Sequence, residues 1–143
     1  MTTTDPAVSI VVPVRNEAGN IAPLVEEIAA AIDGHWPFEV VYVNDGSSDT
    51  TDDELRGLMA RYSWLRRVRH KQSCGQSAAV RSGVAAARAP LVVTLDGDGQ
   101  NDPTFIPAGM VIVVVSLVVF MLTKTMVRRL SWAWLKAATF SPL

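Results

Sequence analysis

The stretch Val8-Ser9-Ile10-Val11-Val12-Pro13-Val14 is short, apolar and rich in β-branched side chains. A run that is apolar on both faces is typical of a strand buried inside a parallel sheet. Residues 38–43 and 91–95 have the same character, and we expect a strand in each. Residues 65–70 form a further candidate, whose three arginines favour a position at the edge of the sheet.

Helical segments separate these candidate strands. Apolar side chains recur at helical spacing from about residue 20 to residue 33, and Gly34 follows. A second helix is expected to begin at Asp49 or Thr50, and a third, rich in alanine, occupies residues 75–89. This alternation predicts an α/β fold with a mostly parallel sheet of about four strands and helices on its faces.

The charge of the chain is divided unevenly along its 143 residues. Residues 1–103 carry 14 acidic and 9 basic side chains, whereas residues 104–143 carry four bases and no acid. Because the globular part is acidic and contains no recognisable nucleic-acid-binding motif, the sequence argues against nucleic acid as a partner. The single cysteine, Cys74, excludes an internal disulfide and fits a reducing compartment. Residues 1–8 lack a basic start and an apolar core, so we expect no signal peptide and a cytoplasmic globular part.

The last part of the chain has a different composition. Residues 104–123 carry no charge, residues 110–122 are almost all apolar, and basic residues and tryptophans follow. A membrane-spanning helix needs about 20 apolar residues, and basic and tryptophan side chains commonly anchor its ends. We therefore expect a globular domain in residues 1–108 and a hydrophobic, membrane-associated tail with an apolar helix in residues 109–143. A buried hairpin or strand remains the alternative, favoured by the many valines.

The expected location is the inner (cytoplasmic) membrane, with the globular part facing the cytoplasm. Two arrangements of the tail stay open. It could span the bilayer, or it could enter and return so that its tryptophans lie at the inner interface.

Acidic side chains follow three of the predicted strands. Glu17 comes after the first strand, Asp45 and Asp49 after the second, and Asp96 and Asp98 after the one at residues 91–95. Ligands of parallel sheets bind beyond the carboxyl ends of the strands, where these loops should meet. A merely solvated acidic rim is the alternative.

Asp96, Asp98 and Gln100 lie in the same phase of an extended segment, because side chains repeat every second residue. Mg²⁺ or Mn²⁺ is held by one or two carboxylates while substrate phosphates fill other positions. The loop therefore predicts a divalent cation that in turn binds a diphosphate. An EF-hand and a dinucleotide fingerprint are both rejected, because the residues that each motif requires at fixed positions are absent. His70 and Cys74 have no evident partner in the sequence, so a zinc site and a reactive thiol have little support.

Four motifs, in this order, resemble family 2 glycosyltransferases, most closely the dolichol- or undecaprenyl-phosphate sugar transferases. They are Val12-Pro13-Val14-Arg15-Asn16-Glu17, Val43-Asn44-Asp45-Gly46-Ser47-Ser48-Asp49, Gly75-Gln76-Ser77-Ala78-Ala79 and Asp96-Gly97-Asp98-Gly99-Gln100. The resemblance covers about residues 7–108. It implies the N-terminal half of a nucleotide-diphospho-sugar transferase-like fold of the glycosyltransferase A (GT-A) type.

The implied activity is that of a hexosyltransferase. It would move a sugar from a nucleotide-diphospho-sugar to a polyprenyl- or dolichyl-phosphate lipid, with inversion at the anomeric carbon. Seven residues would form the substrate site: Pro13, Arg15, Glu17, Asp45, Asp96, Gly97 and Asp98. Asp45 would face the base and Asp96 the ribose or sugar. Asp98 and Gln100, with Asp96, would hold Mg²⁺ or Mn²⁺ as the DxD motif.

The sequence departs from the family after this motif. Family members continue into an acceptor half that supplies phosphate-binding and catalytic residues, whereas here the apolar tail follows. The resemblance thus implies a donor half truncated after the DxD motif, with no assignable catalytic residue. Two other hypotheses remain open: a non-catalytic nucleotide-sugar-binding or partner-dependent membrane protein, and a non-functional fragment.

Overall fold

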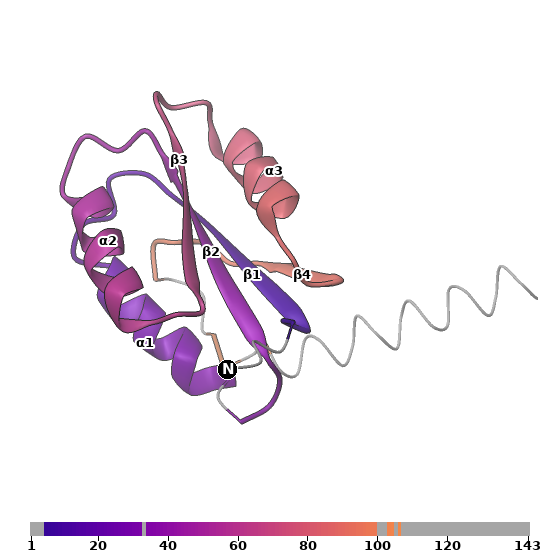
Figure 1. Ribbon diagram of the computed structural model, residues 1–143. Coiled ribbons are helices and arrows are strands. Elements are labelled where there is room, and N and C mark those ends of the chain that lie inside the picture. The colour runs from indigo at the N-terminus through magenta and orange to yellow at the C-terminus, as the bar shows by residue number, and fades with distance from the viewer. Residues whose placement is uncertain (1–4, 33, 100–102, 105, 107–143) are drawn as a thin grey trace, which may run out of the picture. The chain divides into compact units, whose positions relative to one another are not determined.

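The computed structural model describes residues 5–32, 34–99, 103–104 and 106. In this part, strands and helices alternate along the chain (Figure 1). Their order is β1 (Val8–Val14), α1 (Ile21–Ile32), β2 (Phe38–Asp45), α2 (Thr51–Arg61), β3 (Leu65–His70), α3 (Gln76–Ala86) and β4 (Leu91–Thr94). The α/β prediction is confirmed. The main difference is that β2 continues two residues further than expected, so that Asp45 ends the strand instead of lying in the loop.

The four strands form one sheet in the order β3-β2-β1-β4, and every neighbouring pair is parallel. Strand β1 is central, with Val14 opposite Asn44 of β2 and Val8 opposite Leu91 of β4. The carboxyl ends of β1, β2 and β4 therefore lie along the same edge. The arginine-rich strand β3 is at an outer edge of this sheet, as its sequence predicted.

Helices cover both faces of the sheet (Figure 1). Helix α3 packs against β1 and β2, where Val11, Val41, Val43 and Ala79 form a buried cluster. Helices α1 and α2 lie side by side over the opposite face, and α1 buries its apolar residues there. This arrangement favours predominantly apolar strands, because both faces of β1 and β2 are hidden from water.

The edge arginines of β3 are paired with acidic side chains of neighbouring elements. At the start of the sheet, Glu39 is buried and accepts hydrogen bonds from Ser9 Oγ (2.6 Å), an Arg66 guanidinium nitrogen (2.7 Å) and the Arg88 N–H (2.6 Å). Burial raises the pKa of Glu39, but these hydrogen bonds outweigh it and hold the pKa below its ordinary value. The network joins β1, β2, β3 and the segment before β4.

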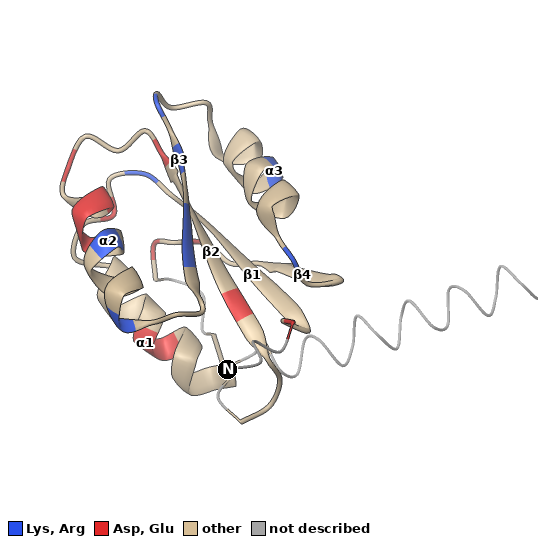
Figure 2. Ribbon diagram, viewed as in Figure 1, with Lys and Arg blue, Asp and Glu red and all other residues tan. Residues whose placement is uncertain are grey.

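A second group of charges ties α2 to β3. Asp52 accepts from Asn44 Nδ2 at 2.9 Å and forms ion pairs with Arg67 (2.5 Å) and Arg69 (3.5 Å). Figure 2 shows the acidic start of α2 and the basic residues of β3. Burial raises the pKa of Asp52, but the hydrogen bonds and the two arginines have the larger effect and hold the pKa below its ordinary value. Arg67 and Arg69 thus attach the edge strand β3 to helix α2.

The predicted tail falls outside the described part of the chain. This applies to residues 109–143, their apolar helix and the domain boundary at residue 108. Among the helices that the structure does describe, none has the length and apolar character needed to cross a bilayer. The predictions for the tail remain predictions.

Candidate functional site

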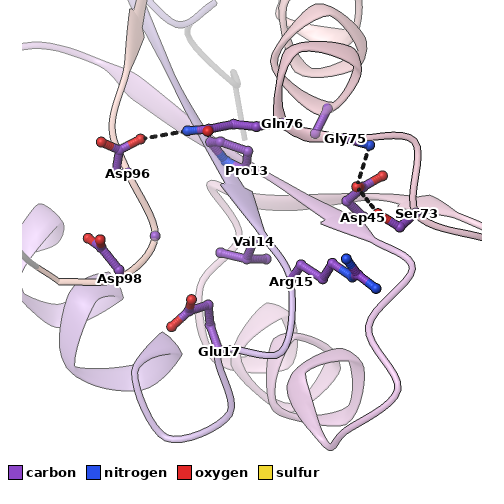
Figure 3. A pocket seen from close by; sticks show the side chains of 12 residues that line it. Pro13, Val14, Arg15, Glu17, Asp45, Ser73, Gly75, Gln76, Asp96 and Asp98 are labelled. Carbon is purple, nitrogen blue, oxygen red and sulfur yellow. Dashed lines mark hydrogen bonds between the residues drawn. The ribbon is translucent and has the colours of Figure 1, made fainter.

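A pocket of about 470 Å³ opens at the carboxyl edge of the sheet (Figure 3). The loop after β1, the end of β2, the start of α3 and the loop after β4 all contribute to its wall. The residues that line it are Pro13, Val14, Arg15, Glu17, Asp45, Ser73, Gly75, Gln76, Ala79, Asp96, Gly97 and Asp98.

All seven predicted substrate residues line this one pocket, although they come from the ends of three separate strands and the loops that follow them. Gln100, the remaining predicted cation ligand, lies outside the described residues. Asp49 does not line the pocket, although it belongs to the acidic set that the sequence placed at this edge. The geometry brings the predicted set together, while the chemical role of each member remains a prediction.

The start of α3 forms a wall that the sequence analysis left without a role. Ser73, Gly75, Gln76 and Ala79 lie there, and Gln76 Nε2 donates to Asp96 Oδ1 at 3.1 Å. Gly75 has a φ of 90°, a left-handed conformation that favours glycine. The motif at residues 75–79 was visible in the sequence. Its glycine, directly before a predicted helix, was the signal that could have placed this motif at the site.

Gly97 has a packing function at the pocket wall. A Cβ at this position would collide with Val14 Cγ1 and lie 2.9 Å from the Pro13 carbonyl oxygen. Only glycine allows the loop after β4 to lie this close to the end of β1. In Figure 3, Asp98 lies on the side of the pocket where Glu17 lies, and Asp96 lies beside Gln76.

Asp45 is buried, and its carboxylate accepts four hydrogen bonds. Oδ1 accepts from His70 Nδ1 (2.6 Å) and the Cys74 N–H (2.8 Å), and Oδ2 from Ser73 Oγ (2.8 Å) and the Gly75 N–H (2.9 Å). Burial raises the pKa of Asp45, but these bonds together lower it far below its ordinary value. An ionised carboxylate only accepts, so His70 Nδ1 carries a proton. A neutral His70 then accepts from Ser82 Oγ through Nε2 at 2.9 Å.

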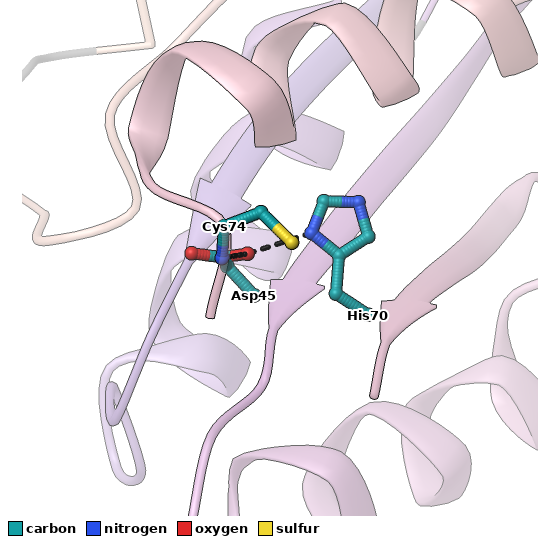
Figure 4. Close-up of side chains that lie close together, drawn as sticks. All are labelled: Asp45, His70 and Cys74. Carbon is teal, nitrogen blue, oxygen red and sulfur yellow. Dashed lines mark hydrogen bonds and ion pairs between the residues drawn. The ribbon is translucent and has the colours of Figure 1, made fainter. Parts of the chain in front are cut away.

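The prediction that His70 and Cys74 have no partner is wrong, because both donate hydrogen bonds to Asp45. The His70 side chain is only 15% exposed, and ligand atoms of Asp45, His70 and Cys74 lie within 4.8 Å of one another (Figure 4). Within the described part of the chain, this is the one such group of three with ligand-type atoms. Because the carboxylate already accepts four donors, a metal ion there would have to break bonds that hold the fold.

The remaining charges of the pocket belong to Arg15, Glu17, Asp96 and Asp98. Arg15 is exposed and makes no hydrogen bond or ion pair with another described residue. Its guanidinium is therefore available to an anion or an aromatic ring. Asp96 and Asp98 contribute hard oxygen atoms, the donors that Mg²⁺ and Mn²⁺ prefer, so the side chains present fit such a cation.

Comparison with known proteins gives a consistent result. The family model described as Glycosyl transferase family 2 matches residues 9–110. A dodecaprenyl-phosphate galacturonate synthase from Rhizobium johnstonii is 42% identical over 102 residues, which are 70% of this chain and 30% of that protein. An undecaprenyl-phosphate 4-deoxy-4-formamido-L-arabinose transferase from Aeromonas hydrophila is 38% identical over 102 residues, 70% of this chain and 31% of that protein.

A solved structure shares the fold. It is a mannosyltransferase from Pyrobaculum calidifontis in complex with GDP-Man and Mn²⁺, with a TM-score of 0.59 and 29% identity. The match covers 67% of this chain and 28% of that one. The chain thus spans about 30% of the length of the curated relatives it matches.

Proposed function

Because this chain belongs to glycosyl transferase family 2, we propose that its pocket binds a nucleotide-diphospho-sugar as the donor of a glycosyl transfer. The observation that carries the proposal is the meeting of three strand ends and their loops in one pocket, with the exposed guanidinium of Arg15 and several carboxylates on its walls. Such a mixture suits a ligand with an anionic diphosphate and a neutral sugar, provided that a cation offsets the carboxylates.

Asp96 and Asp98 are proposed to hold that cation, Mg²⁺ or Mn²⁺, with Gln100 as a further ligand. The bound cation supplies Lewis-acid stabilisation of the nucleoside diphosphate as it leaves. The mannosyltransferase with the same fold was solved with GDP-Man and Mn²⁺, which supports this assignment. Asp96 also accepts from Gln76, so one of its oxygen atoms is oriented by α3.

Arg15 and Asp45 are proposed to contact the nucleotide. The Arg15 guanidinium offers positive charge to a phosphate or a flat face to the base. Asp45 has all four of its acceptor positions filled, and three of the donors are fixed backbone or ring N–H groups. The fourth donor is the Ser73 hydroxyl, which can rotate. We propose that the ring N–H of uracil or guanine replaces the Ser73 hydroxyl as the fourth donor to Asp45.

The acceptor is proposed to be a polyprenyl phosphate, because the relatives from R. johnstonii and A. hydrophila carry dodecaprenyl phosphate and undecaprenyl phosphate in their names. Such lipids reside in the membrane. The apolar composition of residues 109–143 supports association with a membrane, which we propose to be the inner membrane, with the pocket in the cytoplasm. The catalytic base stays unassigned.

Calorimetry on the full chain tests the donor site. UDP, GDP and ADP are titrated with Mn²⁺ and again with an excess of chelator. Binding of UDP or GDP that requires Mn²⁺ is the expected result, and no binding of any of the three would contradict the proposal. A second assay follows transfer of labelled sugar to polyprenyl phosphate. Binding without transfer would favour the non-catalytic binding module over the enzyme.

A further inference from the structure

The loop between β1 and α1 is held in an unusual way. Its Asn16 has a φ of 57°, in the left-handed region that residues other than glycine seldom adopt. Four consecutive backbone N–H groups of this loop, at residues 16–19, each donate to a different side chain of residues 47–54. Asn16 donates to Ser47 Oγ (2.9 Å), Glu17 to Thr51 Oγ1 (3.0 Å), Ala18 to Asp49 Oδ2 (3.2 Å) and Gly19 to Glu54 Oε1 (3.0 Å). We call residues 16–19 the strapped loop.

The contact is reciprocal at one point. The Ser48 N–H donates to Asn16 Oδ1 at 2.9 Å, which gives the strained residue a second hydrogen bond to the same partner segment. Strained backbone persists only where surrounding contacts over-determine it. The side chains of residues 47–54 supply those contacts.

Asp49 has a central place among the side chains that hold the strapped loop. Besides the Ala18 N–H, it accepts from Thr51 Oγ1 (2.6 Å) and the Thr51 N–H (3.1 Å). The buried Thr51 hydroxyl donates to Asp49 and accepts from the Glu17 N–H, so Asp49 also orients the group that holds Glu17. A single carboxylate thereby controls two adjacent N–H groups of the strapped loop, one directly and one through Thr51.

We propose that Asp49 is a positioning residue for the donor pocket, which it serves without lining it. It fixes the strapped loop and thereby the side chains of Glu17, which belongs to that loop, and of Arg15, which directly precedes it. The two aspartates of Asn44-Asp45-Gly46-Ser47-Ser48-Asp49 therefore have different roles: Asp45 lines the pocket, whereas Asp49 lies outside it and holds the loop after β1. The part of this inference that concerns ligand affinity rests on the proposed function; the part that concerns the loop does not.

The test compares Asp49→Ala with Asp53→Ala in the full chain. The control removes the same charge from the same helix start, and the Asp53 side chain is 78% exposed with only a 3.8 Å ion pair to Arg56. Hydrogen exchange is measured without ligand. In Asp49→Ala, the N–H groups of Glu17 and Ala18 should exchange about tenfold faster or more, while amides of β1 and β2 stay protected. Exchange at Glu17 and Ala18 equal to that of the control would overturn the proposal.

Affinity for UDP or GDP with Mn²⁺ gives the second readout. Asp49→Ala should weaken binding about tenfold, a loss of about 1.4 kcal/mol, while Asp53→Ala stays within about twofold. If Asp49 acts through Arg15, then Asp49→Ala should cost much less than tenfold in an Arg15→Ala background, because the two changes remove one shared effect. Fully additive losses would exclude Arg15 as the residue through which Asp49 acts, and unchanged affinity in Asp49→Ala would overturn the positioning role.

The outcomes separate this proposal from the proposed function. A wild-type chain that binds no nucleoside diphosphate contradicts the donor site, and the exchange measurement still decides whether Asp49 holds the loop. If Asp49→Ala does not fold, Asp49→Asn replaces it. Asparagine keeps the size of the side chain and one acceptor oxygen, so faster exchange should then appear at one of the two N–H groups. Normal exchange at both would count against the proposal.

Discussion

Asp45 and His70 are opposite each other in the parallel register of β2 and β3, and His70 Nδ1 donates to Asp45 Oδ1 over 2.6 Å. The imidazole reaches Ser82 Oγ with its other nitrogen, at 2.9 Å. One ring therefore connects the end of β2, the end of β3 and helix α3 behind the pocket wall.

Replacing His70 with alanine should lower the free energy of unfolding by about 1–3 kcal/mol, because a buried charged acceptor loses a donor. Urea denaturation followed by circular dichroism measures the change. His35→Ala is the matched control, since His35 is exposed, and it should have little effect. Equal stabilities for the two variants would mean that the Asp45–His70 contact contributes nothing.

Asp98→Asn should lower the affinity for UDP or GDP in the presence of Mn²⁺ by at least about tenfold. The amide keeps the shape of the side chain but removes the charge that a hard divalent cation requires. Calorimetry with and without chelator measures the effect, and Asp53→Asn serves as a control for the lost charge. A variant whose binding still depends on Mn²⁺ to the same degree would exclude Asp98 as a ligand.

The preference among nucleotide bases should distinguish the role of the Asp45 carboxylate from that of the Ser73 hydroxyl. The wild-type chain should prefer UDP or GDP to ADP, because an acceptor-only carboxylate matches a ring N–H that adenine lacks. Ser73→Ala should keep this preference, since the base is proposed to replace the Ser73 hydroxyl. Asp45→Ala should bring the affinity ratio toward one. The ratio of dissociation constants is the quantity to compare, and an unchanged ratio in Asp45→Ala would argue that the base is recognised elsewhere.

Gly97→Ala should cost about 1–3 kcal/mol of stability, because the new methyl group would collide with Val14 and overpack the contact. Nucleoside diphosphate affinity should fall as well, since Asp96 and Asp98 would be displaced. Gly57→Ala is the control: its Cβ meets nothing within 4 Å, and alanine is the better helix former. Thermal unfolding that treats both variants alike would refute the packing role of Gly97.

Removal of residues 109–143 should move the protein from the membrane fraction to the soluble fraction. The uncharged stretch from Thr104 to Thr123 supplies most of the expected partitioning into a bilayer. Fractionation after expression measures the effect. A full-length chain that is already soluble would contradict the membrane assignment, and digestion of residues 1–103 by external protease in intact cells would contradict the cytoplasmic orientation.

The sequence was sufficient to predict the helices and strands, and also the edge of the sheet at which the site lies. Buried parallel strands are mostly apolar on both faces, and parallel neighbours usually need a helical crossover, so short apolar runs alternating with helical segments leave few other folds. Parallel strands also point the same way. Glu17, Asp45, Asp96 and Asp98 could therefore be assigned to one edge without knowing the strand order.

The tertiary structure decided which polar side chains contact each other at that edge of the sheet. The pairing of Asp45 with His70 depends on the β2–β3 register, which no local pattern in residues 65–70 encodes. Asp49 looked like a pocket residue, yet its carboxylate faces the strapped loop, because four N–H groups that cannot join a helix or sheet need acceptors. Sequence periodicity reports burial along one element. The partners of a polar side chain depend on how separate elements pack, and that is fixed only when the chain is folded.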